Sequence, residues 1–339
     1  MIYPEFLKEG NTIGVPAPSS GGADEVHINR FKNAVKKMKE KGYNIVESKN
    51  MFKNDFARSA SAEVRGKEIN DMFSDDNIDF LIALAGGEFL VECLPYIDFD
   101  MIASKKKYFC GFSDPTGIIW PLTTKYDIST IYGMNFGEYG IEEYENITNN
   151  LEIIKGNLVE QKSFEKYDNG ETKSLTGLEG YDLTEKNEWK VLNGKKAKFS
   201  GRVLAGCFDL IAELAGTKYD GTPEFVDKYK DDGIVYIFDN CELSKEETIR
   251  VLWKFNELGY FKYCNGVMFG KFGVDNGISY SGYENVEQCL RDSVLAKLNI
   301  PVIFDADVSH KDPSMTIVNG SIITIESENG KGTIKMELK

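Results

Sequence analysis

The first 140 residues alternate short apolar runs with amphipathic stretches, and this alternation restricts the fold more than any other feature. Amphipathic stretches at 24–42 and 61–77 place apolar residues near helical spacing, and Gly42 marks the end of the first stretch. Apolar runs of strand length stand around them, at 12–17, 43–48, 78–85, 107–113 and 129–136. Strands that alternate with helices predict a parallel sheet that is covered by helices on both faces.

Two strands of this predicted sheet lead into residues that are suited to chemistry. The run IDFLIALA leads into Gly86-Gly87, and the run KYFCGF leads into Ser113. In open α/β sheets the functional loops lie at the carboxyl ends of the strands. We therefore expect Ser113 and the glycine pair at the same edge of the sheet.

The rest of the chain predicts a second domain. With 339 residues, the chain has a length at which two domains are expected. Residues 141–200 are polar and rich in Gly, Asn, Glu and Lys, which predicts a linker region between an N-terminal domain at 1–140 and a C-terminal domain at 201–339. The second domain contains the buried-strand pattern GIVYIF and a hairpin signal at Asn329-Gly330.

Composition restricts the partners and the compartment. The chain has 40 basic and 54 acidic residues, a net charge of −14, so a nucleic acid would be repelled unless a local basic patch intervened. No apolar run approaches the roughly 18–20 residues that a membrane span needs, and the N-terminus lacks a signal-peptide pattern. The six cysteines form no C-x-x-C pair and are expected as reduced thiols. We expect a cytoplasmic protein with neither nucleic acid nor membrane as partner.

The common cofactor signatures are absent from the sequence. It contains no G-x-G-x-x-G after a strand, no G-x-x-x-x-G-K-[ST] and no H-E-x-x-H. Only two histidines are present, which disfavours a histidine-based metal site. The acids Asp305, Asp307 and Asp312 around His310 could bind a metal, but clustered acids in a loop are usually solvated. We expect neither a cofactor nor a metal.

A serine nucleophile needs a base, and the scarcity of histidine limits the choice. His27 stands at the start of a predicted surface helix, whereas His310 follows the strand PVIFDA and could lie over Ser113. A carboxylate should orient the imidazole and stabilise its cation. Asp239, at the end of GIVYIF, is the first choice for this role, and Glu242 is the second.

An oxyanion hole requires two backbone N–H groups. The amide of Asp114, directly after the candidate nucleophile, and one amide of the Gly86-Gly87 loop would supply them, because glycine permits a close approach of the substrate. Each residue taken alone also has an ordinary interpretation, as a turn residue or as a helix cap. The sequence also departs from the G-x-S-x-G elbow, because Pro115 stands where that pattern has its second glycine.

Several segments together resemble the LD-carboxypeptidase family of serine peptidases, in particular its branch of microcin C self-immunity proteins. The similar segments span nearly the whole chain: GNTIGVPAPSS, LIALAGGE, GFSDPT, GRVLAGCFDLIAELAGT, GIVYIFDN and PVIFDADVSHKDPSMTIVNG. The resemblance implies an α/β fold with a flavodoxin- or Rossmann-like parallel-sheet first domain and a smaller mixed α/β second domain. It also implies a Ser…Glu…His triad that draws on both domains, and a homodimer that needs no metal.

Carried over to this sequence, the resemblance implies Ser113 as nucleophile, His310 as general base, and the amides of Gly87 and Asp114 as the oxyanion hole. The acidic residue departs from the family pattern, because Asp239 stands where glutamate is usual. Aspartate is shorter by one methylene, so the structure has to decide whether it reaches His310.

The resemblance further implies a small peptide-like amide as substrate. LD-carboxypeptidases remove the terminal D-alanine of murein tetrapeptides, and the immunity branch hydrolyses an amide in peptidyl- or aminoacyl-nucleotides. Trp189 is a candidate for stacking on a nucleobase, with packing of the linker onto the domain as the alternative. The sequence therefore predicts a serine peptidase or amidohydrolase. The alternative is a binding protein on the same scaffold with weakened catalysis, for which Asp239 is the motive.

Overall fold

The computed structural model describes residues 1–170, 175–273 and 279–339, which form two compact units of similar size. Unit 1 comprises Met1–Asn157, Glu171–Tyr181 and Thr316–Val318, and unit 2 comprises Leu158–Gly170, Asp182–Met315 and Asn319–Lys339. Residues of the predicted linker, 141–200, are thus shared between the two units, and its residues 171–174 lie outside the described part of the chain.

Unit 1 is built on a six-stranded sheet with the strand order β14-β5-β4-β3-β1-β2. Its strands are β1 (Thr12–Val15), β2 (Asn44–Glu47), β3 (Phe80–Ile82), β4 (Phe109–Gly111), β5 (Ile131–Tyr132) and β14 (Ile317–Val318). The first five strands pair in parallel, as the sequence predicts, and β14 pairs with β5 in the antiparallel direction. A two-residue strand from the C-terminal half therefore completes the N-terminal sheet.

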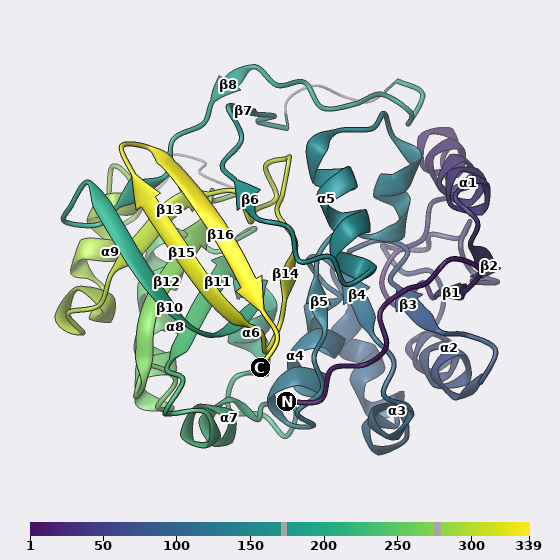
Figure 1. Ribbon diagram of the computed structural model, residues 1–339, viewed down its shortest axis with the longest axis horizontal. Coiled ribbons are helices and arrows are strands. Elements are labelled where there is room, and N and C mark those ends of the chain that lie inside the picture. The colour runs from purple at the N-terminus through teal and green to yellow at the C-terminus, as the bar shows by residue number, and fades with distance from the viewer. Residues whose placement is uncertain (171–174, 274–278) are drawn as a thin grey trace. The chain divides into compact units, whose positions relative to one another are not determined.

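Helices cover both faces of this sheet. They are α1 (Glu25–Glu40), α2 (Ala62–Ser74), α3 (Phe99–Lys105), α4 (Thr116–Thr124) and α5 (Glu145–Ile154), with the 3-10 helices η1 (Leu90–Tyr96) and η2 (Phe136–Gly140). Asp24 caps α1 and Ser61 caps α2, because each side chain accepts a bond from a backbone N–H of the first turn. In Figure 1, α1 lies on one side of β1 and β3, whereas α2 and α3 lie on the other.

Unit 2 is built on an eight-stranded mixed sheet with the order β6-β16-β15-β10-β11-β12-β13-β9. Its strands are β6 (Gln161–Lys162), β9 (Lys190–Val191), β10 (Lys196–Cys207), β11 (Ile234–Asp239), β12 (Cys264–Gly270), β13 (Val302–Ala306), β15 (Ile322–Glu328) and β16 (Lys331–Glu337). The four central strands, β10 to β13, pair in parallel and the outer ones are antiparallel. A separate pair joins β7 (Lys166–Tyr167) to β8 (Glu185–Lys186).

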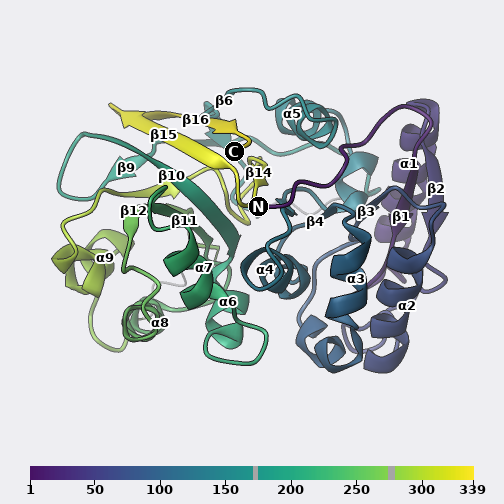
Figure 2. The ribbon, with the colours of Figure 1, turned by 60° about the horizontal axis from the view of Figure 1, so that its bottom comes forward.

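The helices of unit 2 connect its parallel strands. They are α6 (Phe208–Leu214), α7 (Thr222–Lys228), α8 (Lys245–Glu257) and α9 (Val286–Asp292), with the 3-10 helix η3 (Val294–Lys297). Figure 2 shows α6, α7 and α8 together on one side of β10, β11 and β12. Asn329 and Gly330 have φ values of 53° and 82°, which is the geometry of the predicted two-residue hairpin turn between β15 and β16.

The predicted fold class is confirmed, because a parallel sheet forms the N-terminal part and a mixed sheet the C-terminal part. Among the described residues, no helix combines the length and the apolar character that are needed to cross a membrane. In both sheets the parallel strands bring their carboxyl ends to one edge, which is where the candidate residues lie.

Candidate active site

Ser113 lies on a sharp turn between β4 and α4 in unit 1. Its φ of 66° is in the left-handed region, which costs a residue with a Cβ atom about 1–2 kcal/mol. Backbone hydrogen bonds of 2.9 Å close the turn, from the Thr116 N–H to the Ser113 carbonyl and from the Gly117 N–H to the Asp114 carbonyl. This strained strand-to-helix turn has the geometry of a nucleophile elbow, with the serine at the N-terminal end of a helix.

Two residues at and after β5 hold the elbow. The Asn135 side chain spans the backbone of Phe112: its Oδ1 accepts from the Phe112 N–H at 3.0 Å, and its Nδ2 donates to the Phe112 carbonyl at 3.1 Å. The Ser113 N–H donates to the Tyr132 hydroxyl at 3.3 Å, and the Tyr132 ring stacks on Phe112 with centroids 5.0 Å apart. Sequence reasoning missed both residues, because they reach the elbow only through the pairing of β4 with β5.

Pro115 is accommodated by a glycine elsewhere in the turn. A Cβ atom on Gly111 would lie 2.6 Å from the Pro115 Cβ, so the pyrrolidine ring fills the space that a side chain at 111 would need. Pro115 is the N-cap of α4, where its missing N–H is not required. The Asp114 carboxylate is buried, and its Oδ2 accepts from the Leu90 N–H at 2.9 Å. A catalytic role for Asp114 would therefore use its backbone amide.

The Gly86-Gly87 loop lies against Ser113. A Cβ atom on Gly86 would be 3.1 Å from the Ser113 Cβ and 3.5 Å from its Oγ, whereas a Cβ on Gly87 would be 3.0 Å from the Ser19 Cβ. The hydroxyl of Ser20 donates to the Gly86 carbonyl at 2.6 Å. These loops follow β1, β3 and β4, at the point where β1 pairs with both β2 and β3. Unit 1 thus brings the candidate nucleophile and the glycine loop together at a topological switch point, the usual ligand position in such sheets.

Unit 2 brings together the other two predicted residues. Asp239 is the last residue of β11 and is completely buried, and its Oδ1 lies 2.9 Å from Nδ1 of His310, in the loop after β13. The shorter aspartate therefore reaches the imidazole. His27, the other histidine, is half exposed at the start of α1 and lies 2.6 Å from Asp24.

The surroundings of His310 favour its charged form. Burial lowers the pKa of His310, but the charge of Asp239 and the hydrogen bonds to Asp239 and Cys241 outweigh burial and raise the pKa well above its ordinary value. The carboxylate thus orients the ring and stabilises the imidazolium ion that forms when a base accepts a proton.

A second carboxylate fixes the loop that follows Asp239. The side chain of Asp209, in the first turn of α6, accepts from the backbone N–H groups of Cys241 at 2.9 Å, Glu242 at 2.8 Å and Leu243 at 3.1 Å. Glu242, the second choice for orienting the histidine, is exposed on this loop. Asp209 was not predicted from sequence, because it lies in α6 and its partners lie in the loop after β11.

Asp307 anchors the start of the loop that carries His310. It is completely buried and forms an ion pair of 2.5 Å with Lys271, which follows β12 and is 6% exposed. Its Oδ2 accepts from Trp189 Nε1 at 2.8 Å, Asn187 Nδ2 at 2.9 Å and the Phe164 N–H at 3.1 Å. Asp307 is therefore saturated by donors of the protein, and its surroundings do not match the metal alternative.

Asp305 and Trp189 also have structural partners. Asp305 pairs with Lys190 at 2.8 Å. Trp189 is 2% exposed and packs on the β15-β16 hairpin, where a Cβ atom on Gly332 would overlap its ring. The structure thus places Trp189 in the packing role that the sequence left open as the alternative to stacking on a nucleobase.

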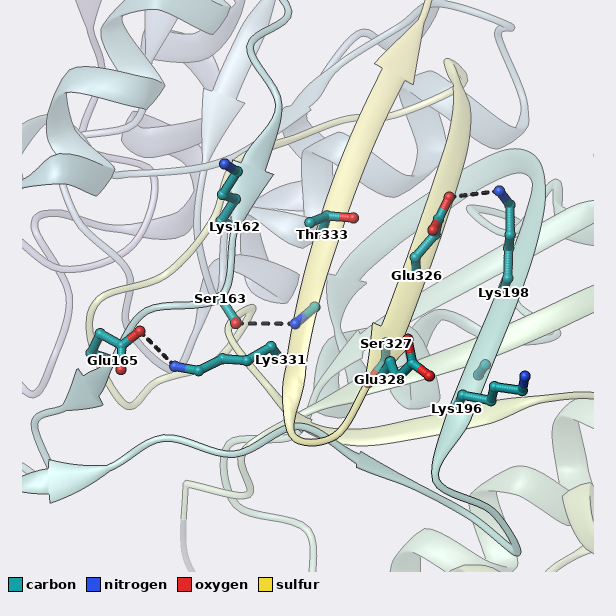
Figure 3. Close-up of a pocket in the computed structure, with 12 residues that line it drawn as sticks. Lys162, Ser163, Glu165, Lys196, Lys198, Glu326, Ser327, Glu328, Lys331 and Thr333 are labelled. Carbon is teal, nitrogen blue, oxygen red and sulfur yellow. Dashed lines mark hydrogen bonds and ion pairs between the residues drawn. The ribbon is translucent and has the colours of Figure 1, made fainter.

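One hollow of unit 2 lies away from these residues. It has a volume of about 820 Å³ and is lined by residues of β6, β16, β15 and β10 and their neighbours. Figure 3 shows that its charged side chains pair with one another, Lys198 with Glu326 and Lys331 with Glu165, each at 2.7 Å. None of the predicted site residues lines this hollow, and we assign it no catalytic role.

Comparison with known proteins identifies the family of the chain. Residues 13–133 match the LD-carboxypeptidase N-terminal domain, and residues 200–325 match the LD-carboxypeptidase C-terminal domain. The microcin C7 self-immunity protein MccF of Escherichia coli is 26% identical over 349 residues, with 95% of this chain and 92% of that protein covered.

Solved structures show the same fold. An MccF-like protein from Bacillus anthracis superposes with a TM-score of 0.80 at 22% identity, and MccF in complex with glutamyl sulfamoyl guanosine superposes with a TM-score of 0.78 at 22% identity. Both comparisons cover 100% of each chain. Because the two domain matches together span most of the sequence, the chain belongs to the LD-carboxypeptidase family.

Proposed function

We propose that this protein is a serine peptidase or amidohydrolase that cleaves a small peptide-like amide with Ser113, His310 and Asp239. The observation that carries the proposal is the buried hydrogen bond of 2.9 Å between Asp239 and His310, at the strand edge of unit 2. A strained serine against a glycine loop in unit 1 supplies the matching nucleophile. Strained backbone and perturbed titratable groups are typical of catalytic sites.

The chemistry follows from these groups. Because Nδ1 of His310 is engaged by Asp239, Nε2 is the nitrogen that accepts the proton from the Ser113 hydroxyl. The serine oxygen attacks the amide carbonyl, and the N–H groups of Gly87 and Asp114 stabilise the resulting oxyanion. His310 then returns the proton to the leaving amine, and a water molecule hydrolyses the acyl-enzyme with His310 again as base.

Two substrate classes fit the proposal. The family name supports a peptide from which the terminal residue is removed, such as a murein tetrapeptide. The complex of MccF with glutamyl sulfamoyl guanosine supports an aminoacyl nucleotide. The resemblance adds a homodimer in the cytoplasm to the proposal. The alternative is a binding protein with weakened catalysis, which the short side chain of Asp239 suggested. This alternative is weaker because Asp239 contacts His310.

The test is incubation of the wild type and of Ser113→Ala with a murein tetrapeptide and with an aminoacyl sulfamoyl adenosine, followed by mass spectrometry. We expect the wild type alone to release D-alanine from the first compound or the sulfamoyl nucleoside from the second. Saturable binding of either compound without turnover would favour the binding protein instead. Full activity of His310→Ala would contradict the proposed triad.

A further inference from the structure

A small cavity beside the His310 loop has no role in the mechanism above. It has a volume of about 280 Å³ and lies entirely within unit 2. Its lining includes Tyr167, Lys190, Lys271, Asp305 and Lys311. The cavity is therefore formed at the carboxyl ends of β12 and β13, the same edge of the sheet to which Asp239 belongs.

Of the four lysines that line the cavity, three pair with an acid. Lys190 pairs with Asp305 at 2.8 Å, and Lys271 pairs with the buried Asp307 at 2.5 Å. A further lining lysine, Lys186, bonds to Glu188. Within the described ranges, Lys311 is the lining lysine that has no acidic partner.

Two further properties suit the cavity to a small anion. Burial raises the pKa of Tyr167, so its hydroxyl keeps the proton that it needs as a hydrogen-bond donor. The chain as a whole has a net charge of −14, which repels anions from most of its surface. A cavity with a local excess of positive charge is therefore a favourable place for an anion to bind. Phe272 and Val286 add apolar surface to the lining.

The proposed reaction requires a carboxylate close to His310. This histidine returns a proton to the amine of the leaving residue, and in an α-amino acid the carboxylate carbon is two bonds from that amine. With standard bond lengths, a carboxylate oxygen then lies within about 4 Å of the nitrogen. Lys311 is the next residue in the chain, with its Cα about 3.8 Å from that of His310.

We propose that this cavity is the subsite for the free carboxylate of the substrate's terminal residue. Lys311 is its ionic partner, and Tyr167 is its neutral hydrogen-bond donor. The apolar surface from Phe272 and Val286 suits a short side chain such as the methyl group of alanine. The inference rests on the proposed function, since the carboxylate is that of the residue which the reaction releases.

The experiment compares a tetrapeptide that ends in a free carboxylate with the same peptide as its terminal amide. For Lys311→Gln we expect the KM of the acid to rise at least 10-fold with little change in kcat, and the kinetics of the amide to stay within 2-fold. Lys311→Arg should restore the KM of the acid, because it keeps the charge. Lys186→Gln is the matched control, since that lysine lines the same cavity but already has an acidic partner.

A lower kcat for acid and amide alike in Lys311→Gln would overturn the inference, because it would show a structural effect on His310. An unchanged KM for the acid would overturn it too. If the wild type hydrolyses no peptide, binding of N-acetyl-D-alanine by calorimetry still decides the question. Weaker binding of N-acetyl-D-alanine to Lys311→Gln than to Lys186→Gln then supports the subsite, although the proposed function has failed. Equal binding to the two variants overturns the subsite.

Discussion

At the scale of single residues, the proposed chemistry depends on the contact between Asp239 and His310. The resemblance to the family implies glutamate at this position, and the sequence leaves open whether aspartate is long enough. In the structure the strand end carries Asp239 into contact with His310 at 2.9 Å. The protonation state of His310 is therefore set by a carboxylate that is itself completely buried.

The first prediction concerns pH. A general base has to be neutral, and the pKa of His310 is raised in the folded protein. We expect kcat/KM to rise with pH through a midpoint above the ordinary histidine value of about 6.5. Asp239→Asn should move this midpoint to lower pH and reduce kcat by roughly 10²–10⁴-fold. A midpoint that does not move in the variant would contradict the role of Asp239.

The same titration affects stability. The pKa of His310 is higher in the folded than in the unfolded protein. The contact of charged His310 with Asp239 therefore stabilises the native state fully at pH values below the unfolded pKa. This stabilisation is lost as the pH rises through the folded pKa. Unfolding by denaturant at a series of pH values measures this trend. In Asp239→Asn we expect a flatter dependence of the unfolding free energy on pH over the same interval.

The second prediction concerns strain at an exposed turn. Phe56 and Ala57 have φ values of 45° and 61° in a two-residue turn that is closed by bonds between Asp55 and Arg58. Phe56 is 87% exposed, so its replacement loses little burial. Asparagine tolerates this backbone, so we expect Phe56→Asn to raise Tm by about 2–4 °C for a gain of about 1 kcal/mol. Phe56→Ala is the control without this gain, and equal Tm values for both variants would exclude relief of strain.

At the scale of elements, the loop between β13 and β14 is the part that positions His310, the proposed base. Asp307 begins it, and the Met315 N–H donates to the Asp307 carbonyl at 2.6 Å. A Cβ atom on Gly270, at the end of β12, would lie 2.0 Å from the Val308 carbonyl oxygen, so the loop passes directly over that strand end. The Lys271–Asp307 pair and this close approach together hold His310 over the edge of the sheet.

The third prediction tests this anchor. Asp307→Asn leaves the ammonium group of Lys271 buried without its counter-charge, and we expect the free energy of unfolding to fall by about 3–5 kcal/mol. The additional change Lys271→Met should recover part of this loss. The matched control is Asp305→Asn, whose partner Lys190 is half exposed, with an expected change below about 1 kcal/mol. Urea unfolding measures all of these variants, and equal losses at 305 and 307 would contradict the anchor.

At the scale of the whole molecule, unit 1 depends on residues from far along the chain. Thr316 precedes β14, and its hydroxyl accepts a hydrogen bond of 2.8 Å from Asn150, a buried residue of α5 that is 166 positions away. Tyr139 also bonds to the Asn150 amide group. The C-terminal half thus contributes both a strand and a buried polar contact to the N-terminal sheet.

The fourth prediction follows from this contact. Thr316→Val keeps the shape of the side chain but leaves Nδ2 of Asn150 without this acceptor, so we expect a loss of about 1–3 kcal/mol in the free energy of unfolding. Hydrogen exchange should accelerate at β5, which pairs with β14. Thr324→Val, at a half-exposed position of β15, is the control with an expected change below about 0.5 kcal/mol. Faster exchange confined to unit 2 would contradict the assignment of this contact.

The sequence by itself determined the elements and the fold class, because burial patterns repeat over a few neighbouring residues and are visible locally. The alternation in the first 140 residues predicted the parallel sheet, and Asn329-Gly330 predicted the hairpin. Ser113 and His310 could be proposed from sequence because each stands shortly after a strand that the sequence predicts. Their catalytic roles stay predictions for the experiments above.

Only the tertiary structure decided which side chains meet. The support of the elbow by Asn135, the saturation of Asp307, and the reach of Asp239 to His310 depend on the pairing of strands that are distant in the chain. The burial of Trp189 against the C-terminal hairpin is of the same kind. Long-range pairing is selected by the free energy of the whole packed chain, so no local pattern of residues records it.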